Sequence, residues 1–302
     1  MHMPSATASL SPTASRNEAG QAGNAGQKAA RGAPIGVFDS GVGGLSVLRA
    51  LRERLPHEDF IYYADTAYAP YGERGDAYVT ERTRAVTDLL IRKHGIKALV
   101  VACNTATTAA IHVLRADHPE LPLVGLEPGL KPAVAATRTG TVAVLATRGT
   151  LSSAKYAALQ AAHGGPTQVR AVPCDGLVRA IEGFDEAGVA ELCARYMDQA
   201  GPWGDGPGQT DTVVLGCTHY PLVREQLQRH APATVRFIDT GVPVAQQTQR
   251  LLTTADLLAD RASPGSLQLL TSGDAAQLQR AADRWLMPAA TEQAIAAPAH
   301  GL

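Results

Sequence analysis

Two stretches, KALVVACNTAT at residues 97–107 and TVVLGCTHYPL at residues 212–222, decide how this 302-residue chain is expected to fold. Each is an apolar run followed by a small residue, a cysteine and side chains that can begin a helix. Short continuous runs of Val, Leu and Ala are typical of strands covered on both faces, as in parallel sheets. The two cysteines, Cys103 and Cys217, lie about one domain length apart in the sequence. This repeat predicts two similar α/β halves, each of which contributes one cysteine.

Similar β-type runs alternate with helical patterns along the rest of the chain. Apolar residues recur every three to four positions around residues 45–55, 79–90 and 189–196, which predicts amphipathic helices. Alternation of strands with helices of this length favours parallel βαβ units. The candidate strands are residues 35–38, 60–64, 97–102, 122–125, 141–146, 168–173, 212–216, 235–239 and 267–271.

We therefore predict an α/β protein of two similar three-layer domains with mostly parallel sheets, related by a pseudo-twofold axis, with the active site between them. The first domain is expected to comprise residues 34–126 and 240–287, and the second residues 127–239. Residues 1–33 hold one Leu and no aromatic residue, so they bury too little apolar surface to offset the entropy of ordering. We expect them to be a disordered N-terminal tail, and residues 288–302 a loose C-terminal tail.

The composition excludes several classes of function. Lys and Arg number 27 against 28 Asp and Glu, so the chain lacks the positive charge of a nucleic-acid-binding protein. No run approaches the roughly 18 apolar residues of a membrane span, and the start lacks the apolar segment of a secretory signal. Four cysteines without a CxxC pair suit neither a disulfide scaffold nor a zinc ribbon. We expect a cytoplasmic protein that binds no membrane, nucleic acid or metal.

The polar residues that follow the predicted strands are candidates for a functional site, because ligands bind at the carboxyl ends of strands in open α/β sheets. A helix N-terminus after Cys103 or Cys217 would favour the reactive thiolate, and His219 can exchange a proton near neutral pH. Plainer interpretations exist for the same residues. Asp39 is also suited to cap a helix that begins near Gly43, the histidine to a structural role, and the cysteines to the core.

Eight short motifs, in order from about residue 35 to 275, strengthen the functional interpretation. They are IGVFDSGVGGLSV (35–47), APYG (69–72), CNTAT (103–107), GLEPGLKPA (125–133), VAVLATRGTLSS (142–153), GCTHYPL (216–222), FIDTG (237–241) and TSGD (271–274). This set resembles the bacterial glutamate racemases, within the cofactor-independent aspartate/glutamate racemase family.

The resemblance implies an enzyme that interconverts L- and D-glutamate without a cofactor and supplies D-glutamate for peptidoglycan. Two thiols on opposite sides of the substrate exchange its Cα proton. Cys103 is expected to deprotonate D-glutamate and Cys217 to deprotonate L-glutamate. By the same resemblance, Asp39 assists the first thiol and His219 the second, and Glu127 is a further acidic catalytic residue.

The resemblance also supplies a set of substrate-binding residues, which are hydroxyls, an amide and backbone N–H groups with no Arg or Lys among them. The set is Asp39, Ser40, Tyr71, Gly72, Asn104, Thr105, Thr147, Thr218 and His219. The expected partner is the small-molecule substrate, and a homodimer is compatible with the sequence.

The chain departs from the family pattern at Tyr68, where many members have Arg, and its Cys174 and Cys193 match no catalytic motif. Three alternatives remain at this point: an aspartate racemase or single-cysteine decarboxylase of the same superfamily, a Cys-His-Asp hydrolase, and a two-lobed amino-acid-binding protein. The paired cysteines argue against the decarboxylase and leave the hydrolase with an unexplained second thiol. The binding protein would need a signal peptide.

Overall fold

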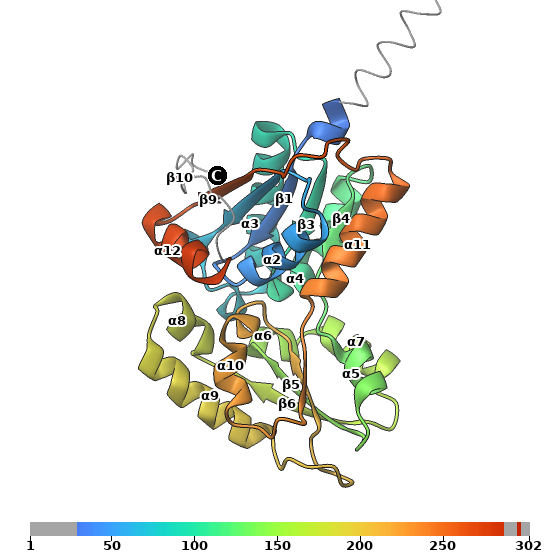
Figure 1. Ribbon diagram of the computed structural model, residues 1–302, viewed down its shortest axis with the longest axis vertical. Helices are drawn as coiled ribbons and strands as arrows, with labels where there is room; N and C mark the ends of the chain where they lie inside the picture. Colours follow the sequence, from blue (N-terminus) through green and yellow to red (C-terminus); the bar gives the residue numbers. More distant parts are fainter. Residues whose placement is uncertain (1–28, 287–294, 297–302) are drawn as a thin grey trace, which may run out of the picture.

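The protein folds into two lobes, each built on one parallel sheet with helices on both of its faces (Figure 1). The computed structural model describes residues 29–286 and 295–296. The first sheet has the strand order β10-β9-β2-β1-β3-β4 and the second the order β6-β5-β7-β8. In both sheets the first strand of the lobe pairs with the second on one side and the third on the other, so the predicted α/β class and the internal repeat are confirmed.

Each of the nine predicted strands is present, with bounds that differ by one or two residues at most. They are β1 (Ile35–Asp39), β2 (Phe60–Ala64), β3 (Ala98–Val101), β4 (Leu123–Gly125), β5 (Thr141–Ala146), β6 (Gln168–Pro173), β7 (Thr212–Leu215), β8 (Arg236–Ile238) and β9 (Leu267–Thr271). A short tenth strand, β10 (Ile295–Ala296), adds to the edge of the first sheet beside β9. The strands were predictable because the central ones are buried along their whole length.

Helices lie in the crossover connections between these parallel strands. They are α2 (Leu45–Arg54), α3 (Asp76–His94), α4 (Asn104–Asp117), α5 (Leu130–Ala136), α6 (Arg148–Leu151), α7 (Ala154–His163), α8 (Leu177–Glu182), α9 (Glu186–Ala200), α10 (Arg224–Gln228), α11 (Gly241–Thr254) and α12 (Ala275–Trp285). In the described part of the chain there are also three short 3₁₀ helices, η1 (Thr66–Tyr68), η2 (Tyr71–Glu73) and η3 (Tyr220–Val223). Within the described residues, no helix has both the length and the apolarity to cross a membrane.

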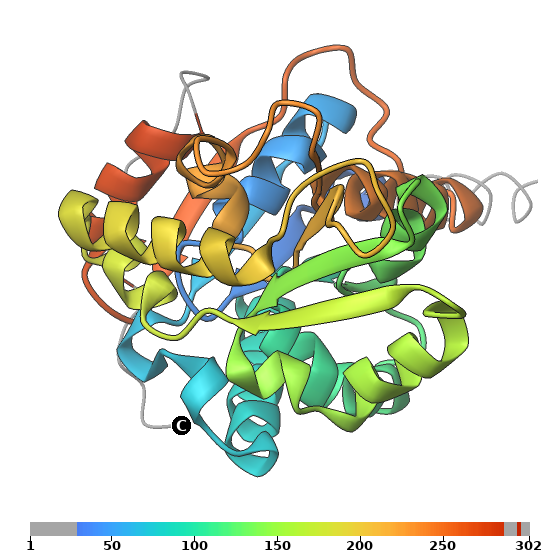
Figure 2. The ribbon, with the colours of Figure 1, turned by 90° about the horizontal axis from the view of Figure 1, so that it is seen from below.

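The hydrophobic core follows the alternation of side chains along the strands. In β1, Ile35 and Val37 pack with α2, α11 and α12, whereas Phe38 packs on the opposite face with α3 and α4. In the second lobe, α9 and α7 lie on opposite sides of β5 and β6 (Figure 2). Both sheets are therefore covered on both faces, and polar groups gather at the strand ends.

The ends of the chain differ in part from the expected tails. Residues 29–32 form a helical turn where a disordered tail was predicted through residue 33. This turn is held because Arg31 pairs with Asp256 and accepts, through its carbonyl, a hydrogen bond from Lys97. Residues 1–28, and all of the predicted C-terminal tail except β10, lie outside the described residues.

Candidate active site

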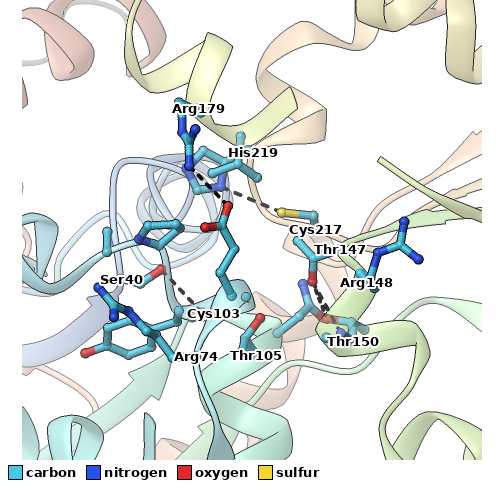
Figure 3. Close-up of a pocket in the computed structure, with 18 of the residues that line it drawn as sticks. Ser40, Arg74, Cys103, Thr105, Thr147, Arg148, Thr150, Arg179, Cys217 and His219 are labelled. Atoms are coloured by element: carbon cyan, nitrogen blue, oxygen red, sulfur yellow. Dashed lines mark hydrogen bonds and ion pairs between the residues drawn. The ribbon is translucent and has the colours of Figure 1, made fainter. Parts of the chain in front are cut away.

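One cavity of about 900 Å³ lies between the lobes, at the carboxyl ends of both sheets (Figure 3). The structure brings most of the predicted site residues together in its walls. Those that line it are Ser40, Tyr71, Gly72, Cys103, Asn104, Thr105, Thr147, Cys217, Thr218 and His219. Asp39 lies just behind the wall and is fully buried. The two predicted catalytic cysteines thus reach one cavity from different lobes.

Cys103 sits where β3 gives way to α4, and it is the N-cap residue of that helix. Its Sγ accepts a hydrogen bond from the Ala106 N–H at 3.4 Å and lies 3.6 Å from Ser40 Oγ. Burial raises the pKa of the Cys103 thiol to about 12, and the nearby Asp39 carboxylate adds to the rise. The helix N-terminus was expected to favour the thiolate here, but desolvation outweighs its hydrogen bond. In the ligand-free protein Cys103 is therefore a thiol at neutral pH.

Asp39 joins the two lobes at the base of the site. Its carboxylate accepts hydrogen bonds from the Gly41 N–H at 2.8 Å, the Ser40 hydroxyl at 3.3 Å and, across the lobes, the Thr218 hydroxyl at 3.0 Å. Burial raises its pKa, although the neighbouring His219 opposes the rise. It does not cap α2, whose N-cap is Gly44 and receives no side-chain bond. The alternative interpretation of Asp39 as a helix cap is thereby wrong.

Cys217 has different neighbours, because a turn and the short helix η3 follow it instead of an α-helix. Its Sγ lies 3.7 Å from His219 Nδ1, and His219 Nε2 lies 2.8 Å from Glu182 Oε1. Burial alone would lower the pKa of His219, but its hydrogen bonds to Cys217 and Glu182 outweigh burial and raise the pKa well above its usual value. The arrangement is a chain from thiol to imidazole to carboxylate, which can pass or hold a proton.

The acidic residue that lines the cavity beside His219 is Glu182, at the end of α8, and not Glu127, which was predicted for this role. The side chain of Glu127 is 55% exposed, pairs with Lys155 at 3.2 Å and does not reach the cavity, so this prediction is wrong. The physical reason is that the Glu127 side chain, between β4 and α5, pairs with Lys155 of α7 and leaves the cavity to other residues. Glu182 lies at the end of α8, which follows β6, and only its place after a predicted strand could have signalled it.

The glycines after Asp39 are explained by how closely the lobes approach each other. A Cβ at Gly41 would overlap the Glu182 carboxylate, and one at Gly43 would overlap the His219 ring and the Thr218 hydroxyl. The backbone N–H of Val42 donates to Glu182 Oε1 at 3.2 Å. The turn therefore positions the histidine and glutamate of the opposite lobe.

The side chain of Asn104 is the clearest sign that the cavity is built to bind a ligand. Its side chain is buried, yet neither its Oδ1 nor its Nδ2 has a hydrogen-bond partner among the described residues. Buried polar groups are normally paired, because an unpaired one costs about 1–3 kcal/mol. Since Asn104 lines the cavity, its amide can pair with a ligand that offers both a donor and an acceptor.

Two details of the lining differ from the expected neutral set. The Tyr71 hydroxyl points away from the cavity to Asp65, so Tyr71 can serve a ligand through its backbone only. The cavity is also lined by Arg74, Arg148 and Arg179, which the sequence analysis did not identify (Figure 3). Arg148 pairs with Asp175 within the second lobe, whereas Arg179 pairs with Glu73 of the first lobe.

Among the described residues, no cluster of His, Cys, Asp or Glu could hold a metal ion. Of the other two cysteines, Cys174 lines the cavity, and burial raises the pKa of its thiol. Cys193 is buried in the core on α9, in agreement with the packing role predicted for it.

Comparisons with known proteins agree with this geometry. The family model described as Asp/Glu/Hydantoin racemase matches residues 35–248. A glutamate racemase of Stutzerimonas stutzeri (strain A1501) is 49% identical over 246 residues, which cover 81% of this chain and 87% of that protein. A glutamate racemase isoform of Bacillus anthracis superposes with a TM-score of 0.77 at 29% identity, over 88% of this chain and 98% of that one. The Escherichia coli glutamate racemase, solved with L-glutamate and an activator, gives a TM-score of 0.73 at 33% identity, over 84% and 95%.

Proposed function

The chain belongs to the Asp/Glu/Hydantoin racemase family, and from this premise we propose that it interconverts L- and D-glutamate by exchanging the Cα proton between Cys103 and Cys217. The activity is that of an amino-acid racemase, an isomerase of cell-wall synthesis that supplies D-glutamate for peptidoglycan. The aspartate racemase alternative is not favoured, because the relatives at about half identity are glutamate racemases.

The observation that carries the mechanism is that the two thiols line one cavity from different lobes. When L-glutamate binds, the Cys217 thiolate removes the Cα proton and the Cys103 thiol delivers a proton to the opposite face. After this turnover Cys217 carries the proton and Cys103 is the thiolate, which is the base that acts on D-glutamate. The assignment of each thiol to an enantiomer follows the family resemblance. Cys103, which is protonated in the ligand-free protein, is already set to donate.

The groups behind each thiol manage its proton. His219 stands beside Cys217 and can pair with its thiolate as an imidazolium, while Glu182 stabilises that positive charge. Asp39 reaches Cys103 through the Ser40 hydroxyl. We assign all three as assisting residues: two to the Cys217 side and Asp39 to the Cys103 side.

The substrate is positioned by neutral groups close to the thiols. The Asn104 amide offers a donor and an acceptor to the amino-acid head group, and we propose that Ser40, Thr105, Thr147 and Thr218 bind its carboxylates and ammonium together with the Tyr71–Gly72 backbone. Proton abstraction from carbon needs more than the 10²–10⁴-fold that a positioned acid–base pair supplies. Exclusion of water and stabilisation of the developing carboxylate charge supply the rest, and closure of the two lobes would provide both.

We further propose that the domains are residues 34–126 with 240–287 and residues 127–239, and that the protein acts in the cytoplasm without a cofactor. A reducing compartment keeps the paired thiols free, as the reaction requires. A homodimer remains compatible with this scheme.

Incubation of the purified protein with L-glutamate in D₂O, without pyridoxal phosphate, tests the function. We expect loss of optical rotation and deuterium at Cα of the D-glutamate formed. Unchanged optical rotation over hours, with protein shown to be folded by circular dichroism, would exclude racemisation. Racemisation without deuterium uptake would exclude proton exchange through the thiols.

A further inference from the structure

A buried ion pair between Arg82 and Asp65 lies next to the cavity. Arg82 Nη2 donates to Asp65 Oδ1 at 3.0 Å and Arg82 Nε donates to Oδ2 at 3.1 Å, so the contact is bidentate. The Arg82 side chain is 8% exposed and that of Asp65 is fully buried. Such a planar, two-bond pair fixes geometry as well as charge. It joins α3 to the end of β2. The proposed reaction uses neither residue.

The loop of residues 65–74 wraps around this ion pair. The Tyr71 hydroxyl donates to Asp65 Oδ2 at 2.5 Å. The Arg82 guanidinium lies over the Tyr68 ring, with its Cζ 3.4 Å from the ring centroid. Asp65 and Tyr68 of the loop thus contact Arg82 directly, and Tyr71 is linked to it through Asp65. This also accounts for Tyr68, the departure from the family pattern, because its ring covers Arg82.

The same loop forms one wall of the substrate cavity. Thr66 and residues 69–74 line it. The loop also touches the opposite lobe, where a Cβ on Gly149 of α6 would lie 2.9 Å from the Gly72 carbonyl oxygen. The position of the loop therefore sets the shape of the wall and its distance from the second lobe.

We propose that Arg82 is a positioning residue for substrate binding, which holds the cavity-lining loop through Asp65 and the Tyr71 hydroxyl. The inference rests on the proposed function, since its readout is the affinity for glutamate. The wall made by this loop includes Glu73 and Arg74 beside its backbone groups, but no thiol or imidazole. It therefore binds the substrate without taking part in the transfer of the proton. Loss of binding of this kind raises KM and leaves kcat unchanged.

The test compares Arg82→Lys with the wild type in both directions of the reaction. Lysine keeps the charge but loses the two-bond fork and the contact of the guanidinium with the Tyr68 ring. We expect KM to rise about tenfold for each enantiomer, with kcat within about threefold of the wild type. Because the enantiomers have equal free energy in water, kcat/KM must fall by the same factor in both directions. Arg84→Gln is the matched control, since Arg84 lies on the same helix and pairs with Asp117 but is exposed. We expect it to leave both constants unchanged.

A purely structural role gives a different result, because it lowers the fraction of folded enzyme and so lowers the apparent kcat at constant KM. That outcome would overturn the proposal. If Arg82→Lys does not fold, Tyr71→Phe decides, because it keeps the ion pair and the ring contacts with Phe38 and Tyr78 and removes one hydrogen bond. We expect its KM to rise about threefold, and an unchanged KM would overturn the proposal. Calorimetry with D-glutamate separates the two claims: a wild type that binds glutamate without racemising it contradicts the proposed function alone.

Discussion

The cavity has two walls, one around Cys103 and one around Cys217, which share the same backbone arrangement but differ in the side chains beside the thiol. Cys103 and Cys217 each follow the third strand of their lobe, at equivalent places in the two sheets. Cys103 then caps a helix and touches a serine, whereas Cys217 stands beside the His219–Glu182 pair. The internal repeat therefore dictates where the thiols lie, and the residues around each thiol determine how its proton is handled.

Because of this difference, the proton is carried by a different kind of group on each wall in the ligand-free protein. On one wall burial raises the pKa of Cys103 to about 12, so that the proton stays on sulfur. On the other wall hydrogen bonds to Cys217 and Glu182 overcome the effect of burial and raise the pKa of His219 well above its usual value, which favours a proton on the imidazole. The resting site is thus suited to a base on the Cys217 wall and an acid on the Cys103 wall.

Removal of either thiol should have the largest effect, because the reaction needs one on each side of the substrate. We expect Cys103→Ala and Cys217→Ala each to lower kcat for racemisation by at least about 10³-fold. Polarimetry with both enantiomers measures this. Cys193→Ala is the control, since that thiol is buried outside the cavity, and it should retain kcat. Near-normal turnover in either active-site variant would contradict the two-wall scheme.

Removal of the carboxylate behind the imidazole should affect the Cys217 wall only. Glu182→Gln keeps the shape but takes away a group that raises the pKa of His219, so we expect kcat to fall about 10²-fold. The alkaline limb of the pH–rate profile should also move to lower pH, because the imidazolium is lost sooner. Glu127→Gln, at an exposed and salt-bridged position, should match the wild type. Equal effects of the two substitutions would remove the role assigned to Glu182.

The contrast between these two glutamates shows what the sequence can and cannot predict. Strands, helices and thiols were predictable because apolar period and strand-end position depend on local sequence. The pairing of Glu182 with His219 was not predictable, because 37 residues separate them and only the folded second lobe brings them together. The prediction that the helix N-terminus favours the Cys103 thiolate failed for a related reason. A helix N-terminus can be recognised in the sequence, whereas the burial that raises the pKa of this thiol cannot.

The close approach of the lobes can be tested at Gly43, whose position touches the Cys217 wall from the first lobe. In Gly43→Ala the new methyl group must displace the His219 ring or the Thr218 hydroxyl. We expect kcat to fall about 30-fold, because a shift of about 1 Å in a catalytic group can cost up to about 10²-fold. Gly32→Ala, which meets no atom within 4 Å, is the control. Wild-type kcat in Gly43→Ala would show that His219 need not hold its position.

The smallest predicted effect is the pH dependence of Cys103 alkylation, and it tests the other wall directly. With its pKa raised to about 12, the thiolate fraction of Cys103 rises about tenfold for each pH unit well beyond the range of an ordinary thiol, whose pKa is about 8.5. Iodoacetamide labelling of the ligand-free protein, followed at the level of single peptides by mass spectrometry, separates Cys103 from the cavity-lining Cys174 and Cys217. A labelling rate that levels off below about pH 9 would mean that Cys103 already loses its proton near neutrality. The two walls would then differ in their partners but not in their resting protons. A labelling rate that continues to rise above about pH 9 would instead mean that bound D-glutamate itself must lower the pKa of Cys103. The ammonium group of D-glutamate is the positive charge available to do so.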